Sequence, residues 1–315
     1  MSSFLSVPAS LLVMGEYAVL EEGGLGIAMA TAPRLQARLD ESARLSVTMR
    51  FGGREERWRD GEGDPPVLVA ACLSAVARLG GRLRGAVEID AAPFYDAEGR
   101  KLGLGSSAAA ALALCAALLR AAGMKEGGGN EDLFAPALEA HRALQGGRGS
   151  GYDVAASLHG GVGLFTGGAA PRWQSLHERS IPAFVLARGA AAVSSAAAIR
   201  AYEEWRSRSP AAATRFLRAS NRRAERFAAA TEEAERHAIL GEAARAGVDL
   251  GRRIGVPAEA EIGTIKDHAL GDLAGRGLAK ALGAGNELIA LFRADSEGGR
   301  PGAPELAVEE GLRWE

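Results

Sequence analysis

A glycine-rich turn leads directly into a strongly apolar helix in the segment Lys101-Leu-Gly-Leu-Gly-Ser-Ser-Ala-Ala-Ala-Ala-Leu-Ala-Leu-Cys115. Gly103 and Gly105 allow backbone conformations and close approaches that a side chain would prevent. Ser106 and Ser107 are expected to cap the helix and to present hydroxyl groups beside its free N–H groups, which attract anions. With the charge of Lys101 just upstream, the turn is predicted to hold nucleotide phosphates, with a serine hydroxyl available to Mg²⁺.

Two better-known phosphate-binding loops do not fit this segment. Gly103-x-Gly105-x-x-Ala108 matches the dinucleotide fingerprint formally, but that fingerprint needs an acidic residue at the end of a second strand about twenty residues later. The sequence there, residues 125–132, is Lys-Glu-Gly-Gly-Gly-Asn-Glu-Asp and does not resemble a strand. A Walker loop needs Gly-Lys-Ser/Thr, which this chain lacks. The remaining structural alternative is a capped core helix preceded by a glycine-containing turn.

Composition limits the classes of partner. The chain has 315 residues, enough for two closely packed lobes, and a formal charge of −2. That charge gives no electrostatic reason to expect nucleic acid or an anionic membrane as a partner. The N-terminus lacks the features of a signal peptide, and Arg120 interrupts the most apolar helix, so we expect a cytoplasmic protein. A monomer or homodimer is expected, and the family resemblance given below implies a small-molecule substrate. Cys72 and Cys115 lie in apolar helical runs and are predicted to be buried thiols.

Hydrophobic periodicity predicts an alternation of strands and helices. Expected strands cover residues 4–7, 11–14, 45–51, 86–90, 162–166 and 183–187, with a glycine turn before a last strand that ends near 292. Expected helices cover residues 67–79, 131–144, 194–205 and 211–251, and the arginines and glutamates of the last two are interpreted as solvated.

Two carboxylates stand out beside glycines. Glu16 follows Gly15 in an otherwise apolar stretch, and Asp153 follows a turn with four glycines at 146–151. The structural alternative for Glu16 is a carboxylate satisfied by nearby backbone N–H groups. The structural alternative for Asp153 is a helix N-cap.

Three glycine-rich segments, in this order, resemble the motifs of the GHMP small-molecule kinases. They are Pro8-x-x-x-x-x-x-Gly15-Glu-Tyr-Ala-Val-Leu20, Gly103-Leu-Gly-Ser-Ser-Ala-Ala109 and the shorter Gly283-Ala-Gly285. Within the family, Lys101-x-Gly-Leu-Gly-Ser-Ser-Ala and Gln145-Gly-x-x-Gly-Ser-Gly-x-Asp-Val-Ala155 most resemble the phosphomevalonate kinase branch. The resemblance implies an α+β fold. Its N-terminal lobe, residues 1–180, would be similar to domain 2 of ribosomal protein S5, and its C-terminal lobe, residues 181–315, would be ferredoxin-like.

The resemblance also implies roles for individual residues. ATP would be bound by the second and third motifs, Mg²⁺ would lie near Ser107, and catalysis would depend on Asp153 and two cations. The residues implied for the nucleotide are Lys101, Gly103, Leu104, Gly105, Ser106, Ser107, Ala108, Gly283, Ala284 and Gly285. Those implied for the acceptor are Ser10, Glu16, Tyr17, Gly149, Ser150, Gly151 and Asp153. Because Ser10 cannot carry positive charge, we expect other cations to act in catalysis, namely Lys101 and Arg148, whose long guanidinium fork could span donor and acceptor phosphates.

The implied activity is the ATP-dependent phosphorylation of 5-phosphomevalonate in the mevalonate route to isoprenoids. Mevalonate kinases place a magnesium-binding glutamate on the helix before the Asp153 motif, and the corresponding position here is His141, which favours the phosphomevalonate branch. The first motif of the family usually contains Pro-Gly-Lys, whereas this chain has Pro8-Ala-Ser10. The alternatives are therefore a mevalonate kinase or another GHMP kinase, or a catalytically weakened relative that binds nucleotide or metabolite.

Overall fold

A computed structural model describes residues 2–78, 80, 83–123, 130–177, 181–189, 194–259, 278–283, 285, 288–292 and 307–315. The chain forms two compact units. The first comprises Met1–Leu11, Met29–Gly161 and Val308–Glu315, and the second comprises Leu12–Ala28 and Val162–Ala307. The division into lobes at residues 180 and 181 stays a prediction. Each unit is described separately below.

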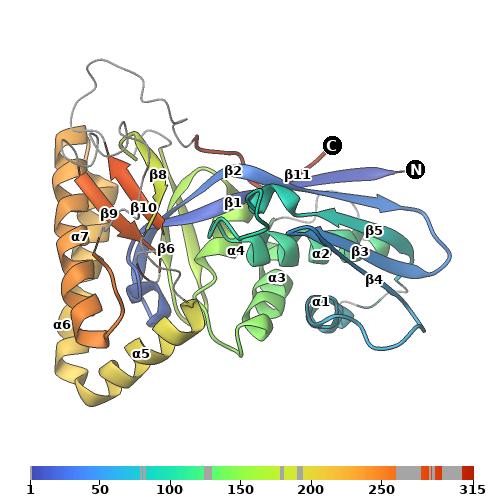
Figure 1. Ribbon diagram of the computed structural model, residues 1–315, viewed down its shortest axis with the longest axis horizontal. Helices are drawn as coiled ribbons and strands as arrows, with labels where there is room; N and C mark the ends of the chain where they lie inside the picture. The colour runs from blue at the N-terminus through green and yellow to red at the C-terminus, as the bar shows by residue number, and fades with distance from the viewer. Residues whose placement is uncertain are drawn as a thin grey trace. The chain divides into compact units, whose positions relative to one another are not determined.

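The first unit is built on a mixed sheet (Figure 1). Its strand order is β11-β1-β2-β5-β3-β4, with β3 parallel to β5 and antiparallel to β4. Leu45, Val47 and Met49 of β3 are buried and alternate with more exposed residues, which confirms the predicted strand with one wetter face. Two of its strands, β1 (Ser3–Met14) and β2 (Leu25–Asp40), include residues of the second unit at one end. The others are β3 (Leu45–Phe51), β4 (Arg54–Arg59), β5 (Gly85–Asp90) and β11 (Arg313–Trp314).

Helices of the first unit pack together beside this sheet (Figure 1). They are α1 (Val67–Ala77), α2 (Ser106–Ala121), α3 (Asn130–Leu144) and α4 (Tyr152–His159), with a short 3-10 turn η2 (Ala92–Phe94). Every residue of α2 from Ala108 to Leu119 is buried, and α2 packs against α1, α3, α4 and β5. A helix that is apolar on all sides belongs in a core, so α2 holds the turn before it on a rigid support.

The second unit combines a three-stranded antiparallel sheet with three helices (Figure 1). The sheet order is β8-β10-β9, α7 packs against β9, and α5, α6 and α7 pack on one another. Its elements are η1 (Ala18–Leu20), β6 (Val162–Thr166), β7 (Arg172–Leu176), β8 (Phe184–Arg188), α5 (Ser195–Arg208), α6 (Pro210–Ala229), α7 (Glu233–Ile254), β9 (Leu278–Leu282) and β10 (Leu288–Phe292).

Two sequence-based expectations differ from this structure. The first two predicted strands, residues 4–7 and 11–14, are one continuous strand, β1, which includes Pro8. The single helix predicted over residues 211–251 is two helices, because the backbone is extended at Ala230. This break allows α7 to return alongside α6. None of the helices in the described part of the chain has the length and apolar character that crossing a membrane requires.

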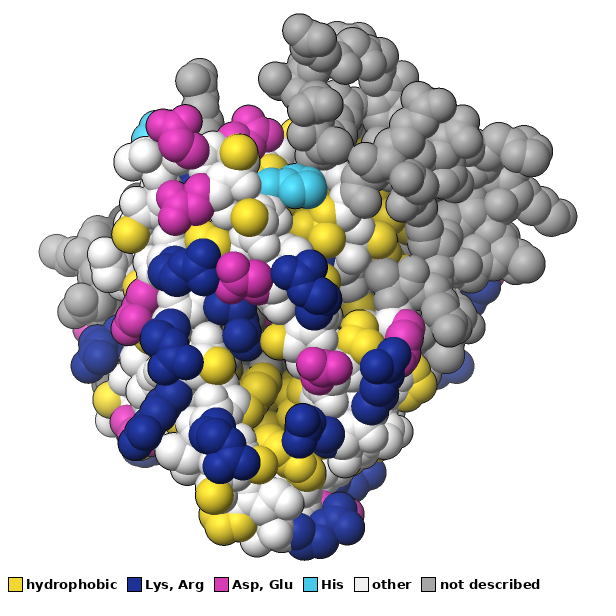
Figure 2. All heavy atoms as spheres, turned by 90° about the vertical axis from the view of Figure 1, so that its left-hand side faces the viewer, with side chains coloured by type: hydrophobic (Ala, Val, Ile, Leu, Met, Phe, Trp, Pro, Cys, Tyr) yellow, Lys and Arg dark blue, Asp and Glu magenta, His cyan; other side chains and the backbone are white. Residues whose placement is uncertain are grey.

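The structure confirms most of the predictions about which residues are buried and which are exposed. Cys72 and Cys115 are buried free thiols, as predicted, and burial raises the pKa of Cys72. The outer face of α6 and α7 carries many Arg side chains mixed with acidic ones (Figure 2). Arg226 of α6 pairs there with Glu242 of α7 at 2.8 Å, and both are substantially exposed. Most of the arginines of α6 are therefore solvated, as expected, with one exception described below.

Candidate functional site

The glycine-rich turn before α2 has the predicted backbone conformation. Gly103 and Gly105 have φ values of 76° and 75°, a region that favours glycine. The expected capping role of the serines is wrong, because α2 begins at Ser106 and Gly105 occupies the N-cap position without a side-chain cap. The first N–H groups of a helix have no partner within it, and here the serine side chains do not occupy them as caps. The terminus therefore keeps donors available to an anion.

Ser10 lies beneath this turn. Its backbone N–H donates to the carbonyl oxygen of Leu104 at 3.1 Å, and a Cβ on Gly105 would clash with its Oγ. Ser10 is only 2% exposed, and its Oγ has no hydrogen-bond partner among the described residues. The turn thus packs directly on the residue that replaces the usual lysine of the first motif. Contact of Ser10 with a substrate stays a prediction.

A hollow of about 160 Å³ lies beside the turn within the first unit. Its wall is mostly apolar, and the hydroxyl groups of Ser106 and Ser107 and the side chain of Lys101 lie at its edge. Tyr95 and Ser106 both line the hollow, and burial raises the pKa of Tyr95. The residues that line the hollow are Met49, Arg50, Phe51, Glu56, Leu68, Ile89, Ala91, Tyr95, Lys101, Ser106, Ser107 and Ala110. An apolar hollow next to phosphate-type donors is the arrangement that a nucleotide base and its phosphates require.

His141 of α3 connects Ser107 with Asp153. The Oγ of Ser107 lies 3.1 Å from the Nε2 of His141, and the Oδ1 of Asp153 lies 3.6 Å from its Nδ1. The amide nitrogen of Gln145 lies 3.3 Å from the same Nε2. The imidazole is 1% exposed, so these neighbours determine its orientation. The structure therefore brings together the predicted metal ligand and the predicted catalytic carboxylate through His141, for which sequence analysis predicted no catalytic role.

The donors around His141 favour one tautomer. The amide nitrogen of Gln145 can only donate, and the hydroxyl of Ser107 can donate as well, so Nε2 acts as the acceptor. The ring proton then lies on Nδ1, which faces the carboxylate of Asp153. A serine that donates its proton to His141 keeps its oxygen lone pairs available for a cation.

Asp153 does not cap α4. The N-cap of that helix is Gly151, with φ 87°, and the Oδ1 of Asp153 accepts a hydrogen bond from the N–H of Val154 at 3.0 Å. The alternative interpretation of Asp153 as a helix N-cap is therefore wrong. Its side chain is 15% exposed, which leaves the carboxylate within reach of a ligand.

An arginine fixes the turn between α3 and α4. The guanidinium of Arg142 donates to the carbonyl oxygens of Gly149 and Ser150 at 3.0 and 3.3 Å. A Cβ on Gly149 would clash with the side-chain oxygen of Gln145, so this glycine is required for close packing. Burial lowers the pKa of Arg142. Sequence analysis missed Arg142, although its place seven residues before Gly149 on the preceding helix was a usable signal.

The two predicted catalytic cations lie at the surface of the first unit. Lys101 forms an isolated β-bridge with Tyr95 at the edge of the hollow, and Arg148 is exposed in the turn before α4. Their catalytic roles stay predictions.

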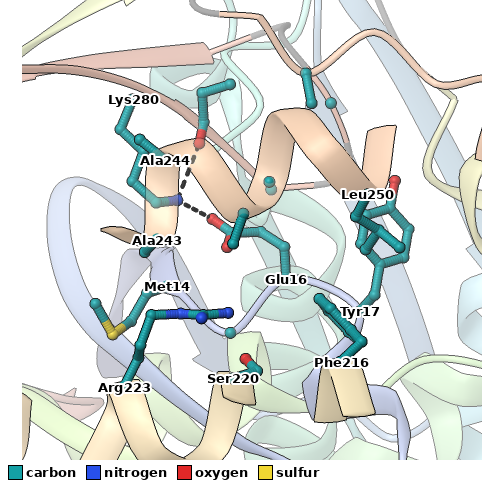
Figure 3. A pocket seen from close by; sticks show the side chains of 17 residues that line it. Met14, Glu16, Tyr17, Phe216, Ser220, Arg223, Ala243, Ala244, Leu250 and Lys280 are labelled. Atoms are coloured by element: carbon teal, nitrogen blue, oxygen red, sulfur yellow. Dashed lines mark hydrogen bonds and ion pairs between the residues drawn. The ribbon is translucent and has the colours of Figure 1, made fainter. Parts of the chain in front are cut away.

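Predicted acceptor and nucleotide residues also occur in the second unit, around a separate cavity (Figure 3). Glu16 forms a buried ion pair with Lys280 of β9, whose ammonium also donates to the carbonyl oxygen of Ala281 at 3.0 Å. Tyr17 has a positive φ of 64°, a strained conformation typical of functional positions. Burial, and secondarily the carboxylate of Glu16, raise the pKa of Tyr17. Its ring stacks on Tyr202 at 5.2 Å.

The third glycine motif reaches the same cavity. Gly283 and Gly285 line it, and Gly283 has φ 71° in the turn between β9 and β10. Ala284 lies outside the described residues. The assignment of this motif to the nucleotide stays a prediction.

The donor set of the first unit fits Mg²⁺ bound chiefly through a nucleotide. Mg²⁺ usually keeps several waters and binds one or two protein oxygens together with substrate phosphates. Ser107 supplies a hydroxyl with free lone pairs, and Asp153 supplies a carboxylate. Both side chains lie beside the imidazole of His141. Among the described residues no cluster of three or more His, Cys, Asp or Glu side chains forms an independent metal cage. These two residues would hold the ion, which would neutralise phosphate charge.

Comparison with known proteins identifies the fold. Residues 68–161, which include the glycine-rich turn, α2, α3 and α4, match the family model described as the GHMP kinases N terminal domain. The chain has the GHMP kinase fold. Its predicted fold class is thereby confirmed. No curated protein matches the sequence significantly.

Solved structures with the GHMP kinase fold cover nearly the whole chain. A Lin0012 protein from Listeria innocua is 21% identical with a TM-score of 0.79, over 100% of this chain and 99% of that one. Phosphomevalonate kinase from Streptococcus pneumoniae, in complex with phosphomevalonate and AMPPNP, is 17% identical with a TM-score of 0.69, over 92% of each chain. Galactokinase from Lactococcus lactis, complexed with galactose, is 13% identical with a TM-score of 0.69, over 99% and 95%.

Variants of His141 are expected to separate its two contacts. A glutamine can place its amide near the position of Nε2 and an asparagine near that of Nδ1. We therefore expect His141→Gln to keep the contact with Ser107 and lose that with Asp153, and His141→Asn to do the reverse. Loss of the Ser107 contact should weaken binding of the magnesium–nucleotide complex by roughly ten- to a hundredfold, the usual effect of removing a residue that orients a metal ligand.

Calorimetry with AMPPNP, with and without Mg²⁺, measures this effect independently of turnover. Glu139→Gln serves as the control, because Glu139 lies on the same helix with a largely exposed side chain and the substitution leaves both contacts of His141 in place. If His141→Gln and His141→Asn weaken binding equally, the imidazole has only a packing role.

Proposed function

We propose that this protein is an ATP-dependent small-molecule kinase that phosphorylates 5-phosphomevalonate to 5-diphosphomevalonate. The observation that carries the proposal is the connection of Ser107 and Asp153 through buried His141, directly beside an anion-binding turn. A hydroxyl for the metal, a carboxylate for the acceptor and backbone donors for the phosphates are the parts that phosphoryl transfer needs.

The proposed nucleotide site is the hollow of the first unit and the turn beside it. The base would lie in the hollow against its apolar wall, and the phosphates would contact Gly103 to Ala108 and Lys101. The proposal keeps Gly283, Ala284 and Gly285 as nucleotide-binding residues. A structural neighbour of the chain, the Streptococcus pneumoniae enzyme, is in complex with AMPPNP, which supports ATP as the phosphoryl donor.

The mechanism requires little covalent chemistry from the protein. Phosphoryl transfer depends mainly on positioning and on neutralising the developing charge. Asp153 would orient the acceptor or receive its proton, and His141 would hold Asp153 through Nδ1–H. Mg²⁺ beside Ser107 would supply charge neutralisation when it is bound. Lys101 and Arg148 are proposed to add positive charge, since Ser10 cannot.

The choice of acceptor rests on charge. A phosphate acceptor is already anionic, so it needs positive charge around it more than it needs a strong base. The protein has His141 in place of a magnesium-binding glutamate. An imidazole carries no negative charge, so it would repel a second anion less than a glutamate would. The Gly149-Ser-Gly151 turn, Ser10, Glu16 and Tyr17 are proposed to bind the acceptor together with Asp153. The phosphomevalonate complex of the Streptococcus pneumoniae neighbour supports this substrate class.

One observation favours a second candidate, a weakened relative that binds nucleotide or metabolite with little turnover. Ser10 is buried beneath Leu104 and Gly105, so the position of the usual lysine is closed by the turn itself. A mevalonate kinase or another GHMP kinase remains an alternative with respect to the acceptor.

A substrate panel tests the proposal. With Mg-ATP in a coupled ADP-release assay, 5-phosphomevalonate is expected to be the best acceptor among mevalonate, 5-phosphomevalonate, homoserine and galactose. Mevalonate should be poorer by at least about tenfold in kcat/KM, because it lacks the anionic acceptor group. A preference for mevalonate would show that the assignment to the phosphomevalonate kinase branch is wrong. Binding of AMPPNP without ADP release from any acceptor would support the weakened relative.

A further inference from the structure

The cavity of the second unit contains a cation that the predicted site did not include. Arg223 of α6 lines this cavity together with Glu16, Tyr17, Ser220 and Lys280 (Figure 3). The remaining wall is apolar or glycine, with Phe216 of α6, Leu250 of α7 and Met14 of β1 among its members. The cavity measures about 40 Å³, room for a few water molecules or one small polar group.

The lining charges do not balance. Lys280 forms an ion pair with Glu16, and its side chain is 2% exposed, so these two charges neutralise each other within the wall. No hydrogen bond or ion pair joins the guanidinium of Arg223 to another residue in the described ranges. Glu242 of α7, whose charge acts on Arg223, already pairs with Arg226 at 2.8 Å. Among the described residues, the lining side chains therefore carry one positive charge in excess.

Burial makes this excess charge costly. Removal from water lowers the pKa of Arg223, although Glu242 and Glu16 attract the charge from a distance. A partly buried guanidinium without a direct partner loses hydration that nothing nearby replaces. Arg222, its neighbour in sequence, is exposed on the outer face of α6 and has no such cost. Burial of Arg223 therefore needs a reason that ordinary surface placement does not give.

Ser220 supplies a second donor on the same helix face. It lies three residues before Arg223, so the two side chains are neighbours on α6. Ser220 is 6% exposed, and in Figure 3 its hydroxyl and the guanidinium of Arg223 both point into the cavity. A carboxylate or phosphate oxygen pair matches the fork of donors that a guanidinium presents. The described lining does not favour a cation, because its one carboxylate, Glu16, is already paired.

We propose that this cavity binds an oxyanion, a carboxylate or a phosphate group, with Arg223 as its anchor and Ser220 as a second donor. This inference deepens the proposed function, because in the kinase the oxyanion belongs to the acceptor molecule. The Glu16–Lys280 pair forms a neutral wall that leaves the charge of Arg223 for the ligand. Specificity for an anionic acceptor over a neutral sugar follows from this one residue.

Calorimetry on the full-length protein without nucleotide tests the site, with inorganic phosphate and acetate as separate ligands at constant ionic strength. The wild-type protein is expected to bind at least one of them. Arg223→Gln should weaken this binding at least about tenfold, because a charge-assisted bidentate contact is lost. Arg223→Lys should retain part of the affinity. The matched control is Arg222→Gln, which makes the same charge change on the exposed face and should bind as the wild type does.

The two ligands distinguish the kinds of oxyanion, since binding of phosphate alone indicates a phosphate group and binding of acetate alone a carboxylate. If the wild type binds neither, or if Arg223→Gln and Arg222→Gln behave alike, the inference is wrong. A melting curve for each variant excludes loss of the fold as the cause.

Turnover separates this inference from the proposed kinase activity. With the best acceptor of the panel, Arg223→Gln should raise KM at least about tenfold and leave kcat nearly unchanged, as expected for a lost ground-state contact. An unchanged KM would contradict the inference while the kinase stands. Binding of an anion that depends on Arg223, without ADP release from any acceptor, would contradict the kinase while the site stands.

Discussion

Gly105→Val is expected to weaken binding of AMPPNP by at least about a hundredfold, because the turn supplies preorganised backbone donors. Gly105 has φ 75°, and an added Cβ would clash with the Oγ of Ser10. The turn must therefore move away from β1, and its N–H groups no longer point at the phosphates. Calorimetry on folded protein measures the loss.

This variant will also lose stability, contrary to the expectation for a turn at an open surface. Ser10 is buried in β1, so the clash reaches the core, and a non-glycine residue at positive φ costs about 1–2 kcal/mol by itself. The control is Gly61→Val, which has φ 82° and no heavy atom within 4 Å of the added Cβ. It should have the same backbone strain and bind AMPPNP normally. If a folded Gly105→Val protein binds AMPPNP with unchanged affinity, the turn does not bind the nucleotide and serves only as the start of the helix.

Asp153→Asn is expected to lower turnover by roughly two to four orders of magnitude with little change in stability. Since Gly151 is the N-cap of α4, the substitution removes a charge without removing a cap. Asparagine can still accept the hydrogen bond from Val154, so the local backbone should be preserved. The favourable interaction of a negative charge with the first turn of a helix is worth only about 0.3–1 kcal/mol, which sets the expected loss in the free energy of unfolding.

Steady-state kinetics and thermal unfolding on the same preparation check this prediction. Asp132→Asn is the matched control, because Asp132 is exposed in the first turn of α3 and the substitution changes charge in the same way. It should keep full activity and show a similar small change in stability. Parallel losses of activity and melting temperature in Asp153→Asn would mean that the carboxylate acts on the fold and not on the reaction.

Much of the fold could be predicted because its signals are local. Periodicity located most helices and strands, and the motifs around Gly103, Gly283 and the turn before Asp153 indicated the GHMP kinase fold, which the comparisons confirm. The errors have local causes as well. The strand β1 passes through Pro8 without a break, and the left-handed conformation of Gly105 makes it the N-cap in place of a serine.

By itself, the sequence determined the chemistry of the turn before α2, since glycine conformation, serine hydroxyls and a helix terminus lie within seven consecutive residues, 101–107. It also indicated Asp153 and Glu16, because a carboxylate next to glycine in an apolar stretch is unusual. Only the tertiary structure decided that His141 joins Ser107, thirty-four residues away in the chain, to Asp153. Helical periodicity likewise could not show which of the arginines of α6 is turned inward. That depends on the packing of α7, β9 and the turn after β1 around Arg223, and such contacts between distant segments are set by the burial of apolar surface across the whole unit.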